Sequence, residues 1–460
     1  MNYFDTIAAV STPRGKGGVA VIRISGNDAI EIGDRIFSKR LSETVSNHAV
    51  YGKIYLPLAD GSRRVIDDGI ATVFRAPASF TGEDTVEISC HGGVLVTESV
   101  LSACFAAGAR QATAGEFTRR AFVNGKTRLD SAEALSALLE AKTLSQLTLA
   151  RSGMGGHLAK KSDELYERLM KVASELRADI DFPDEDVSEM TDEDLRALLL
   201  GVLEDIKRLA GTYSTGRAVA DGVKTAICGR TNSGKSSLYN RIIGHDAAIV
   251  TDIEGTTRDI LSDTAALGDV TLRISDTAGL RESDDPVERI GISRALDAIY
   301  DAELVLFVID GSRTPDESDL ELAERVKNAS GYKIAIVNKN DLPEREEALD
   351  LAYGFDTTVR LSAKTGDGME KLKAAVSKAF VDGSLDIASD AIVSTARQYG
   401  ALVKASELLG AAIEAFDFGY PSDLVSSDVE RAMTELAALG GRDASDEIVD
   451  RIFSSFCVGK

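Results

Sequence analysis

Short apolar runs separated by polar turns fill the first part of the chain. The runs Val19–Ile24, Ile70–Phe74 and Thr85–Ser89 have the length and the β-branched content of strands. A helical spacing of apolar positions covers roughly residues 93–107. This mixture predicts an α+β domain over residues 1–120.

The apolar period becomes helical over residues 121–216 and again over residues 383–460. Apolar positions recur every three or four residues in four stripes, as on one face of a helix. The stripes are Leu165, Leu169, Val172, Leu176 and Ile180; Leu195, Leu199, Val202, Ile206 and Leu209; Val429, Met433 and Leu436; and Ile448, Ile452 and Phe456.

Strands alternate with helices over residues 217–382. The strand-length apolar runs are Val223–Cys228, Val270–Ser275, Leu304–Asp310 and Lys333–Asn338. Uninterrupted apolar strands suit a parallel sheet that is covered on both faces. We therefore expect an α/β domain inserted into a helical domain that is built from two chain segments.

The charge balance restricts the partners that the chain can bind. Lys and Arg number 52 and Asp and Glu number 74, so the net charge is −22. A protein that holds RNA by neutralising phosphates needs basic surface, which here must be a local patch or a partner's. The scattered cysteines and the absence of long apolar runs predict a cytoplasmic protein with no membrane partner.

A phosphate-binding loop is predicted at Gly229–Ser236, where the sequence GRTNSGKS fits GxxxxGK[ST]. The motif follows a predicted strand and precedes a helical run, which is the context that it requires. Its glycines let backbone N–H groups approach phosphates. Lys235 would pair with the β- and γ-phosphates, and Ser236 would bind Mg²⁺.

Further motifs follow in the order of a GTPase. Asp276–Gly279 (DTAG) would serve the Mg²⁺ shell and the γ-phosphate, and Gly255–Asp259 (GTTRD) offers Thr257 as a second magnesium ligand. Asp341, in Asn338–Asp341 (NKND), can accept two N–H groups of guanine, which adenine lacks. The candidate GTP-binding residues are Asn232, Ser233, Gly234, Lys235, Ser236, Ser237, Thr251, Asp252, Ile253, Glu254, Gly255, Thr256, Thr257, Asp276, Thr277, Ala278, Gly279, Asn338, Lys339, Asp341, Ser362, Ala363 and Lys364.

The group that offsets charge during hydrolysis is left open by these residues. Leu280 stands where some GTPases place a water-orienting glutamine. Arg281 and Arg289 are candidates for an arginine finger, or they are solvated surface charges. Asn232 could coordinate a monovalent cation against the phosphates, or it could serve the turn alone.

With these motifs in view, the chain resembles the tRNA uridine-modifying GTPase family called MnmE or TrmE over nearly its whole length. Two departures are Thr231, where the family usually has proline, and Arg128, where it usually has aspartate. Besides the GTPase motifs, the resemblance rests on residues 5–7 (DTI), 17–26 (GGVAVIRISG), 79–84 (SFTGED), 90–93 (CHGG), 115–118 (GEFT), 124–126 (NGK), 181–184 (DFPD) and 456–460 (FCVGK).

The resemblance implies an N-terminal folate-binding and dimerisation domain, a discontinuous helical domain and an inserted G domain. It implies a potassium-dependent GTPase that acts through G-domain dimerisation, with Glu288 helping to orient the attacking water. The K⁺ ligands would be Asn232, Thr251, Ile253 and Thr256. The positions matching the site for 5-formyl-tetrahydrofolate are Arg23, Glu87, Lys126 and Lys460.

The partners implied by the resemblance are a second copy of the chain, a flavoprotein of the MnmG type and tRNA. The pair would form a heterotetramer, with FAD on the flavoprotein, and would build a carboxymethylaminomethyl-type group at C5 of the wobble uridine. The alternative is a GTPase switch that gates another partner, such as an assembling ribosome, and modifies nothing. Such a switch would not need Arg23, Glu87, Lys126 and the C-terminal tail.

Overall fold

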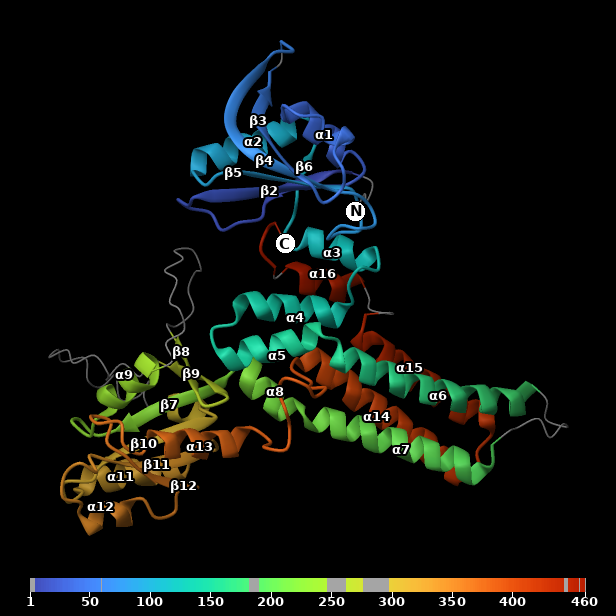
Figure 1. The fold of residues 1–460 in the computed structure, drawn as a ribbon. Helices are drawn as coiled ribbons and strands as arrows, with labels where there is room; N and C mark the ends of the chain where they lie inside the picture. The colour runs from blue at the N-terminus through green and yellow to red at the C-terminus, as the bar shows by residue number, and fades with distance from the viewer. Residues whose placement is uncertain are drawn as a thin grey trace. The chain divides into compact units, whose positions relative to one another are not determined.

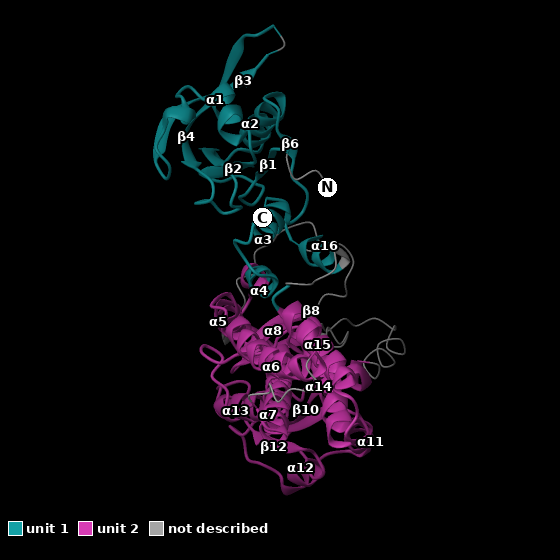
Figure 2. Cartoon of the chain, turned by 90° about the vertical axis from the view of Figure 1, so that its right-hand side faces the viewer, with its two compact units in different colours: residues 1–136, 440–460 teal, residues 137–439 magenta. Residues whose placement is uncertain are grey.

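The computed structural model describes residues 5–58, 60–181, 190–245, 262–275, 298–441, 446–454 and 456–459. The chain forms two compact units, residues 1–136 with 440–460 and residues 137–439 (Figure 2). These units divide the chain differently from the four segments expected above, because residues 440–460 belong to the first unit. The four-part division stays a prediction.

The first unit contains a six-stranded sheet in the order β3-β4-β5-β2-β1-β6 (Figure 1). Helices α1 (Ala29–Ile36) and α2 (Val94–Ala106) pack their apolar side chains on one face of it. The predicted strands and helix of this unit are confirmed. The strands are β1 (Ile7–Val10), β2 (Val19–Ser25), β3 (Ala49–Pro57), β4 (Arg63–Phe74), β5 (Thr85–His91) and β6 (Arg110–Gln111).

The opposite side of this unit carries α3 (Glu116–Val123), the start of α4 (Leu129–Glu140) and α16 (Asp446–Ser454). The predicted stripe of Ile448, Ile452 and Phe456 is wrong, because Ile448 is 40% exposed. The buried face lies one position further along and includes Val449, Phe453 and Phe456, which pack with Leu129 and Ala132 of α4. Phe456 follows the end of the helix, so helical spacing does not place it.

A buried group of ions joins the start of β1 to α3. The guanidinium of Arg120 is 2% exposed and donates to Asp5 Oδ1 at 2.7 Å, to Glu116 Oε1 at 3.1 Å and to Glu83 Oε1 at 3.1 Å. Arg110 donates to the same Asp5 and Glu116 carboxylates. Burial raises the pKa of Glu116, but hydrogen bonds from Arg110, Thr113 and Arg120 outweigh it and hold the pKa below its ordinary value. The Glu116 carboxylate is therefore charged at neutral pH.

The helices of the second unit share one hydrophobic core. Some of these helices precede the second sheet in the sequence and others follow it, and both groups contribute to this core. The predicted stripes are buried there, except that Ile180 is 41% exposed near the end of its helix. The helices are α6 (His157–Asp181), α7 (Asp192–Gly211), α14 (Ala396–Asp417) and α15 (Ser422–Leu439), with α5 (Leu144–Met154) and α8 (Tyr213–Ala220) nearer the sheet.

The second sheet has the order β12-β11-β10-β7-β9-β8, and only β8 runs antiparallel to its neighbour. Separate apolar clusters cover its two faces, so the predicted two-sided burial is confirmed. The strands are β7 (Val223–Gly229), β8 (Ser262–Leu267), β9 (Val270–Ser275), β10 (Leu304–Asp310), β11 (Tyr332–Asn338) and β12 (Thr357–Arg360). The helices are α9 (Lys235–His245), α11 (Glu317–Lys327), α12 (Glu346–Leu351) and α13 (Met369–Phe380).

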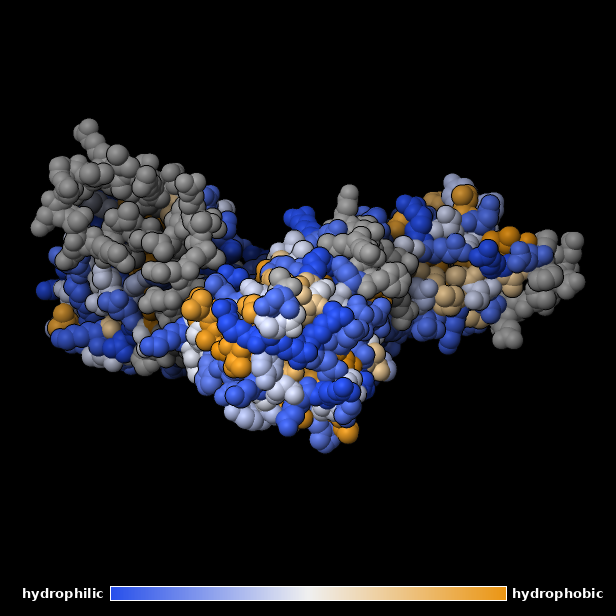
Figure 3. Space-filling view, turned by 90° about the horizontal axis from the view of Figure 1, so that it is seen from above, coloured by the Kyte–Doolittle hydropathy of each residue, from blue (hydrophilic) through white to orange (hydrophobic). Residues whose placement is uncertain are grey.

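The surface seen from above is mainly hydrophilic, with separate hydrophobic patches (Figure 3). None of the helices in the described part of the chain is both long enough and apolar enough to cross a membrane.

Replacing Arg120 with Met should destabilise the first unit strongly, because it leaves the buried carboxylates without a main partner. Breaking a buried ion group in this way typically costs about 3–5 kcal/mol. Hydrogen exchange of peptides from β1 and α3 in the full chain should show that loss. The control is Arg40→Met, which breaks an exposed pair with Glu43 and should cost less than about 1 kcal/mol. Equal protection in the two variants would contradict the central role of Arg120.

Candidate functional site

The loop between β7 and α9 has the backbone of a phosphate-binding loop. Gly229 has φ +146° and Gly234 has φ +100°, values that residues with a side chain rarely adopt. A Cβ at Gly229 would overlap the carbonyl oxygen of Val308, and a Cβ at Gly234 would overlap the side-chain amide of Asn338. Both glycines are therefore required by close packing as well as by backbone conformation.

Lys235 and Ser233 are placed to meet an anion at the start of α9. Lys235 Nζ donates to the carbonyl oxygen of Arg230 at 2.7 Å, and burial lowers the pKa of its ammonium group. Ser233 Oγ is buried without a hydrogen-bond partner in the described part of the chain. The N-terminus of α9 adds the backbone N–H groups of the first helical turn and the positive end of the helix dipole. A phosphate group would satisfy all these donors.

Asn338, the last residue of β11, joins two other loops through its side-chain amide. Its Nδ2 donates to the carbonyl oxygen of Ser233 at 2.8 Å, and its Oδ1 accepts from the backbone N–H of Ala363 at 2.9 Å. The residue is 2% exposed, so both ends of the amide need these partners. The structure thus brings together the predicted phosphate loop, the NKND motif and the Ser362–Lys364 segment.

Asp341 faces the Ser362–Lys364 segment at the expected base-binding position. Ser362 Oγ donates to Asp341 Oδ1 at 2.6 Å, and this hydrogen bond is the main reason that the pKa of Asp341 is lowered. The carboxylate is therefore ionised and is fixed in orientation at neutral pH. In this state it has acceptor capacity left for the paired N–H groups of guanine.

Lys339 adopts a left-handed backbone conformation between Asn338 and Asp341. Its φ is +67°, which is uncommon for a residue with a side chain and is stabilised only by surrounding contacts. Its Nζ donates to Asp310 Oδ2 at 2.7 Å, at the end of β10. Asp310 was not among the predicted site residues, although its place at the end of a central strand was a usable signal.

Arg241 is a second residue that sequence patterns do not identify. It lies on α9 and donates from Nε to the carbonyl oxygen of Ala363 and from Nη2 to that of Lys364, both at 2.7 Å. Through these bonds the helix that begins at the phosphate loop also positions the base-binding segment. No motif contains Arg241, so only the structure reveals this role.

Asn232 and Ser237 lie at the exposed rim of the phosphate loop. Asn232 has φ +65°, a conformation in which Asn is more common than other residues. Its side chain makes no hydrogen bond to any other residue that the structure describes, so it does not cap the turn with these residues. Its carbonyl oxygen is therefore free to meet a ligand.

Several predicted site residues lie outside the described residues. They are the switch residues Thr251, Asp252, Ile253, Glu254, Gly255, Thr256 and Thr257, the motif Asp276, Thr277, Ala278 and Gly279, the candidate catalytic Glu288, and the C-terminal Lys460.

A second candidate site lies in the first unit, where β2 and β5 place Arg23 beside Glu87. Arg23 Nε donates to Glu87 Oε1 at 2.8 Å, and Nη2 forms an ion pair with the same oxygen at 2.8 Å. The guanidinium also lies over the rings of Phe80, at 4.9 Å, and Phe117, at 5.6 Å. Both contacts are made by Oε1, and Oε2 of Glu87 accepts no hydrogen bond from the described residues. It can accept a hydrogen bond from a ligand.

Lys126 contacts the loop that carries Phe80. Its Nζ donates to the carbonyl oxygen of Pro77 at 2.9 Å, and its side chain passes next to Gly82. The C-terminal segment is held in the same unit, since Gly115 N–H donates to Cys457 and Ser11 Oγ donates to the carbonyl oxygen of Gly459. Three of the four predicted folate-binding positions are thus described, with Arg23 and Glu87 in direct contact.

Comparisons with protein families cover nearly the whole chain. A model described as the N-terminus of the GTP-binding protein TrmE matches residues 6–126, and a model described as the MnmE helical domain matches residues 129–457.

Curated relatives match end to end. The tRNA modification GTPase MnmE of Lactococcus lactis subsp. lactis (strain IL1403) is 38% identical over 459 residues, which is 99% of each chain. The protein of the same name from Symbiobacterium thermophilum is 40% identical over 462 residues, again 99% of each chain. The one from Bacillus anthracis is 39% identical over 462 residues, 99% of this chain and all of the relative.

Solved structures match part of the chain. Era of Aquifex aeolicus bound to GDP and AlF4⁻ is 22% identical over 40% of this chain and 65% of Era, with a TM-score of 0.28. The G domain of the T. maritima FeoB iron transporter is 26% identical over 34% of this chain and 97% of that domain, with a TM-score of 0.25.

Replacing Gly234 with Ala should abolish binding of guanine nucleotides, because the added methyl group would collide with the amide of Asn338. We expect at least a roughly 100-fold weaker affinity, since the collision displaces both loops that the amide joins. The measurement is titration of the full chain with fluorescent GDP. Gly244→Ala is the control, because that glycine on α9 has open space around it. Unchanged affinity in Gly234→Ala would contradict the assigned geometry.

Proposed function

The chain belongs to the MnmE family of tRNA modification GTPases, and from this membership we propose that it hydrolyses GTP to modify the wobble uridine of tRNA. The observation that carries the proposal is the amide of Asn338, which holds the phosphate loop and the base-binding segment together. That geometry suits a guanine nucleotide. The full-length match to relatives named for tRNA modification favours this function over a GTPase switch without a substrate.

The nucleotide would bind with its base at Asp341 and its phosphates at the start of α9. The carboxylate of Asp341, oriented by Ser362, would accept the N1–H and N2–H of guanine. Lys235 would exchange its present bond to the Arg230 carbonyl for the β- and γ-phosphates. Mg²⁺, held by Ser236 and Thr257, would neutralise phosphate charge when bound.

Potassium would supply the charge that an arginine finger supplies in other GTPases. Asn232 supports this role because its side chain is exposed and forms no hydrogen bond with the other described residues. Thr251, Ile253 and Thr256 would complete the coordination, and Glu288 would orient the attacking water through other waters. Dimerisation of the G domains would close this site and couple hydrolysis to a conformational change.

A folate would bind beside Arg23 and Glu87 in the N-terminal domain. Glu87 Oε2 is available to the amino and ring N–H groups of the pterin, while Arg23 holds the carboxylate in place through Oε1. The ring of Phe80, which is 40% exposed, provides apolar surface next to it. Lys126 and Lys460 would attract the anionic glutamyl tail, and 5-formyl-tetrahydrofolate would supply the one-carbon unit.

The proposed partners are a second copy of the chain and an FAD-bearing flavoprotein of the MnmG type, joined in a heterotetramer in the cytoplasm. Homodimerisation is supported by an apolar surface on the first sheet. Tyr51 and Ile70 are directly opposite each other on β3 and β4 and are 67% and 45% exposed. Val65, on β4, is 50% exposed. A second copy of the chain could cover this surface.

In the proposed architecture, the G domain is inserted into the helical domain.

The function is tested by reconstitution with unmodified tRNA, the flavoprotein, GTP, K⁺ and 5-formyl-tetrahydrofolate, followed by mass spectrometry of the nucleosides. We expect a modified wobble uridine, and we expect Glu87→Gln to lose both folate binding and this product. Loss of the second acceptor oxygen should weaken folate binding roughly 10- to 100-fold. Glu31→Gln, at an exposed ion pair on α1, is the control. GTP hydrolysis with no new nucleoside would favour the switch alternative.

Hydrolysis should be faster in KCl than in NaCl, and Asn232→Ala should remove the difference. Charge stabilisation by an arginine finger contributes roughly 10³–10⁵ in rate, so we expect at least a ~10-fold response to K⁺. The measurement is phosphate release at saturating GTP in the two salts. Asn240→Ala on the exposed side of α9 is the matched control. Equal rates in both salts would overturn the potassium assignment.

A further inference from the structure

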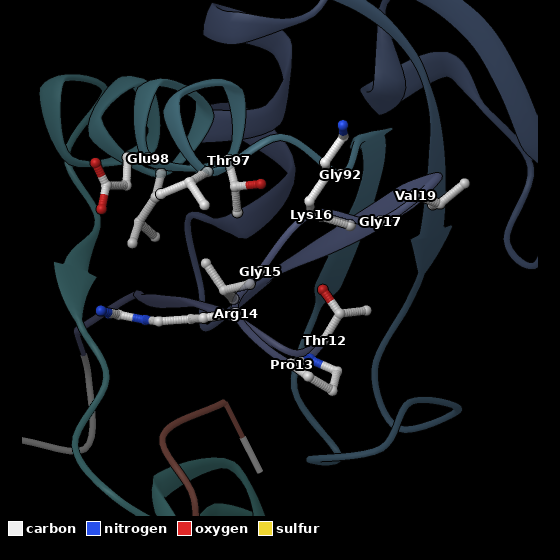
Figure 4. Close-up of a pocket in the computed structure, with 14 residues that line it drawn as sticks. Thr12, Pro13, Arg14, Gly15, Lys16, Gly17, Val19, Gly92, Thr97 and Glu98 are labelled. Carbon is white, nitrogen blue, oxygen red and sulfur yellow. The ribbon is translucent and has the colours of Figure 1, made fainter. Parts of the chain in front are cut away.

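A cavity of about 320 Å³ lies beside the loop that joins β1 to β2 (Figure 4). The loop, residues 11–18, forms one side of it, and α2 forms the other. Ligand pockets span roughly 300–1,000 Å³, so this cavity has room for one nucleoside-sized unit.

The cavity has basic groups at its edge that are available to a ligand. Arg14 and Lys16 are exposed, and neither forms an ion pair with another described residue. In Figure 4 the Arg14 side chain extends toward the side where Glu98 lies, whereas Lys16 extends past Gly92. The two cations therefore flank the space and do not converge on one point.

The remaining lining suits a flat, uncharged ring with hydroxyl groups attached. Val10, Ala20 and Leu101 provide apolar walls, and Thr97 and Glu98 provide polar groups from α2. The Glu98 carboxylate accepts no hydrogen bond from the other residues that the structure describes. A carboxylate in the lining disfavours a simple anion but can accept hydrogen bonds from sugar hydroxyls.

This cavity is separate from the candidate folate site. Ala20 and Val10 face the core on the α2 side of the sheet. Arg23 alternates with Ala20 and Ile22 along β2, so its side chain leaves the opposite face. A ligand beside α2 would therefore not compete with a ligand on Glu87.

The division of charge also favours the first unit as a surface for RNA. Its residues 1–136 and 440–460 contain 18 Lys and Arg against 19 Asp and Glu, whereas residues 137–439 contain 34 against 55. Nearly all of the net negative charge therefore lies in the second unit. Phosphates approach a nearly neutral unit at a lower electrostatic cost.

We propose that this cavity binds one nucleotide of an RNA strand, with a phosphate on either side of it at Arg14 and Lys16. The separate positions of the cations match the two phosphates that flank a nucleotide within a strand, and a free mononucleotide has only one such group. The apolar walls contact the base, and Glu98 accepts hydrogen bonds from the ribose. The inference rests on the proposed tRNA substrate and adds where this chain holds it.

The test is fluorescence anisotropy of the full chain with a labelled RNA anticodon stem–loop. The double variant R14Q/K16Q should bind roughly tenfold more weakly and should lower the slope of log K against log salt by about 1.4. The control R63Q/R64Q removes the same charge from exposed arginines at the start of β4 and should bind as wild type does. Circular dichroism checks that both variants fold.

Two further arms identify the ligand. Uridine monophosphate alone should bind far more weakly than the stem–loop, and Glu98→Gln should reduce the preference for RNA over DNA of the same sequence. Stem–loop binding that is equal in R14Q/K16Q and wild type would overturn the cavity as an RNA site while leaving tRNA modification intact. Equal losses of stem–loop affinity in R14Q/K16Q and R63Q/R64Q would also overturn the cavity as an RNA site, and so would tight binding of uridine monophosphate alone. Wild-type protein that binds no stem–loop would overturn it too, and the reconstitution assay then judges the proposed function independently.

Discussion

The side-chain amide of Asn338 is the interaction on which the candidate nucleotide site depends. A buried amide left without partners costs about 1–3 kcal/mol, so its contacts to Ser233 and Ala363 fix where both loops lie. Gly234 must lack a side chain because the amide occupies that space. Arg241 then ties the base-binding segment to α9, the helix that begins at the phosphate loop. The phosphate loop and the Ser362–Lys364 segment are thus held by one connected group of contacts.

Arg120 has the corresponding role in the first unit, with charges in place of a neutral amide. It holds Asp5, Glu83 and Glu116, which belong to segments far apart in the sequence. Glu83 also accepts a hydrogen bond from Ser25 at the end of β2, the strand that carries Arg23. The ion group therefore fixes the strand and the loop between which Arg23 and Phe80 meet. Charged groups are suited to this because unpaired buried ions are so costly that few alternative arrangements compete.

The sequence predicts regular elements well where one physical signal dominates. The run Leu304–Asp310 matches β10 in full, because a strand buried on both faces is marked by consecutive apolar side chains, here followed by Asp310 at its end. The spacing in α16 was misassigned because Ile448 and Val449 are equally apolar, and only packing against α4 decides which one is buried. Motifs identified Asn338 and Asp341, whereas Arg241 acts by reaching backbone carbonyls, which leaves no trace in residue type. The residue types of Arg23 and Glu87 do not distinguish them from other surface charges, because only the pairing of β2 with β5 brings the two side chains together.

The two units differ strongly in net charge. The second unit contains 34 Lys and Arg against 55 Asp and Glu. It could still bind a polyanionic nucleotide, because the backbone N–H groups and Lys235 at one helix terminus would act at short range. Such a site needs no overall positive potential, since long-range fields between exposed charges are screened within about 8–10 Å. RNA is different, because its phosphates extend beyond any single pocket and meet the field of the whole surface. The nearly neutral first unit is therefore where contacts to an RNA strand oppose the least repulsion, and the rest of the basic surface must come from a partner.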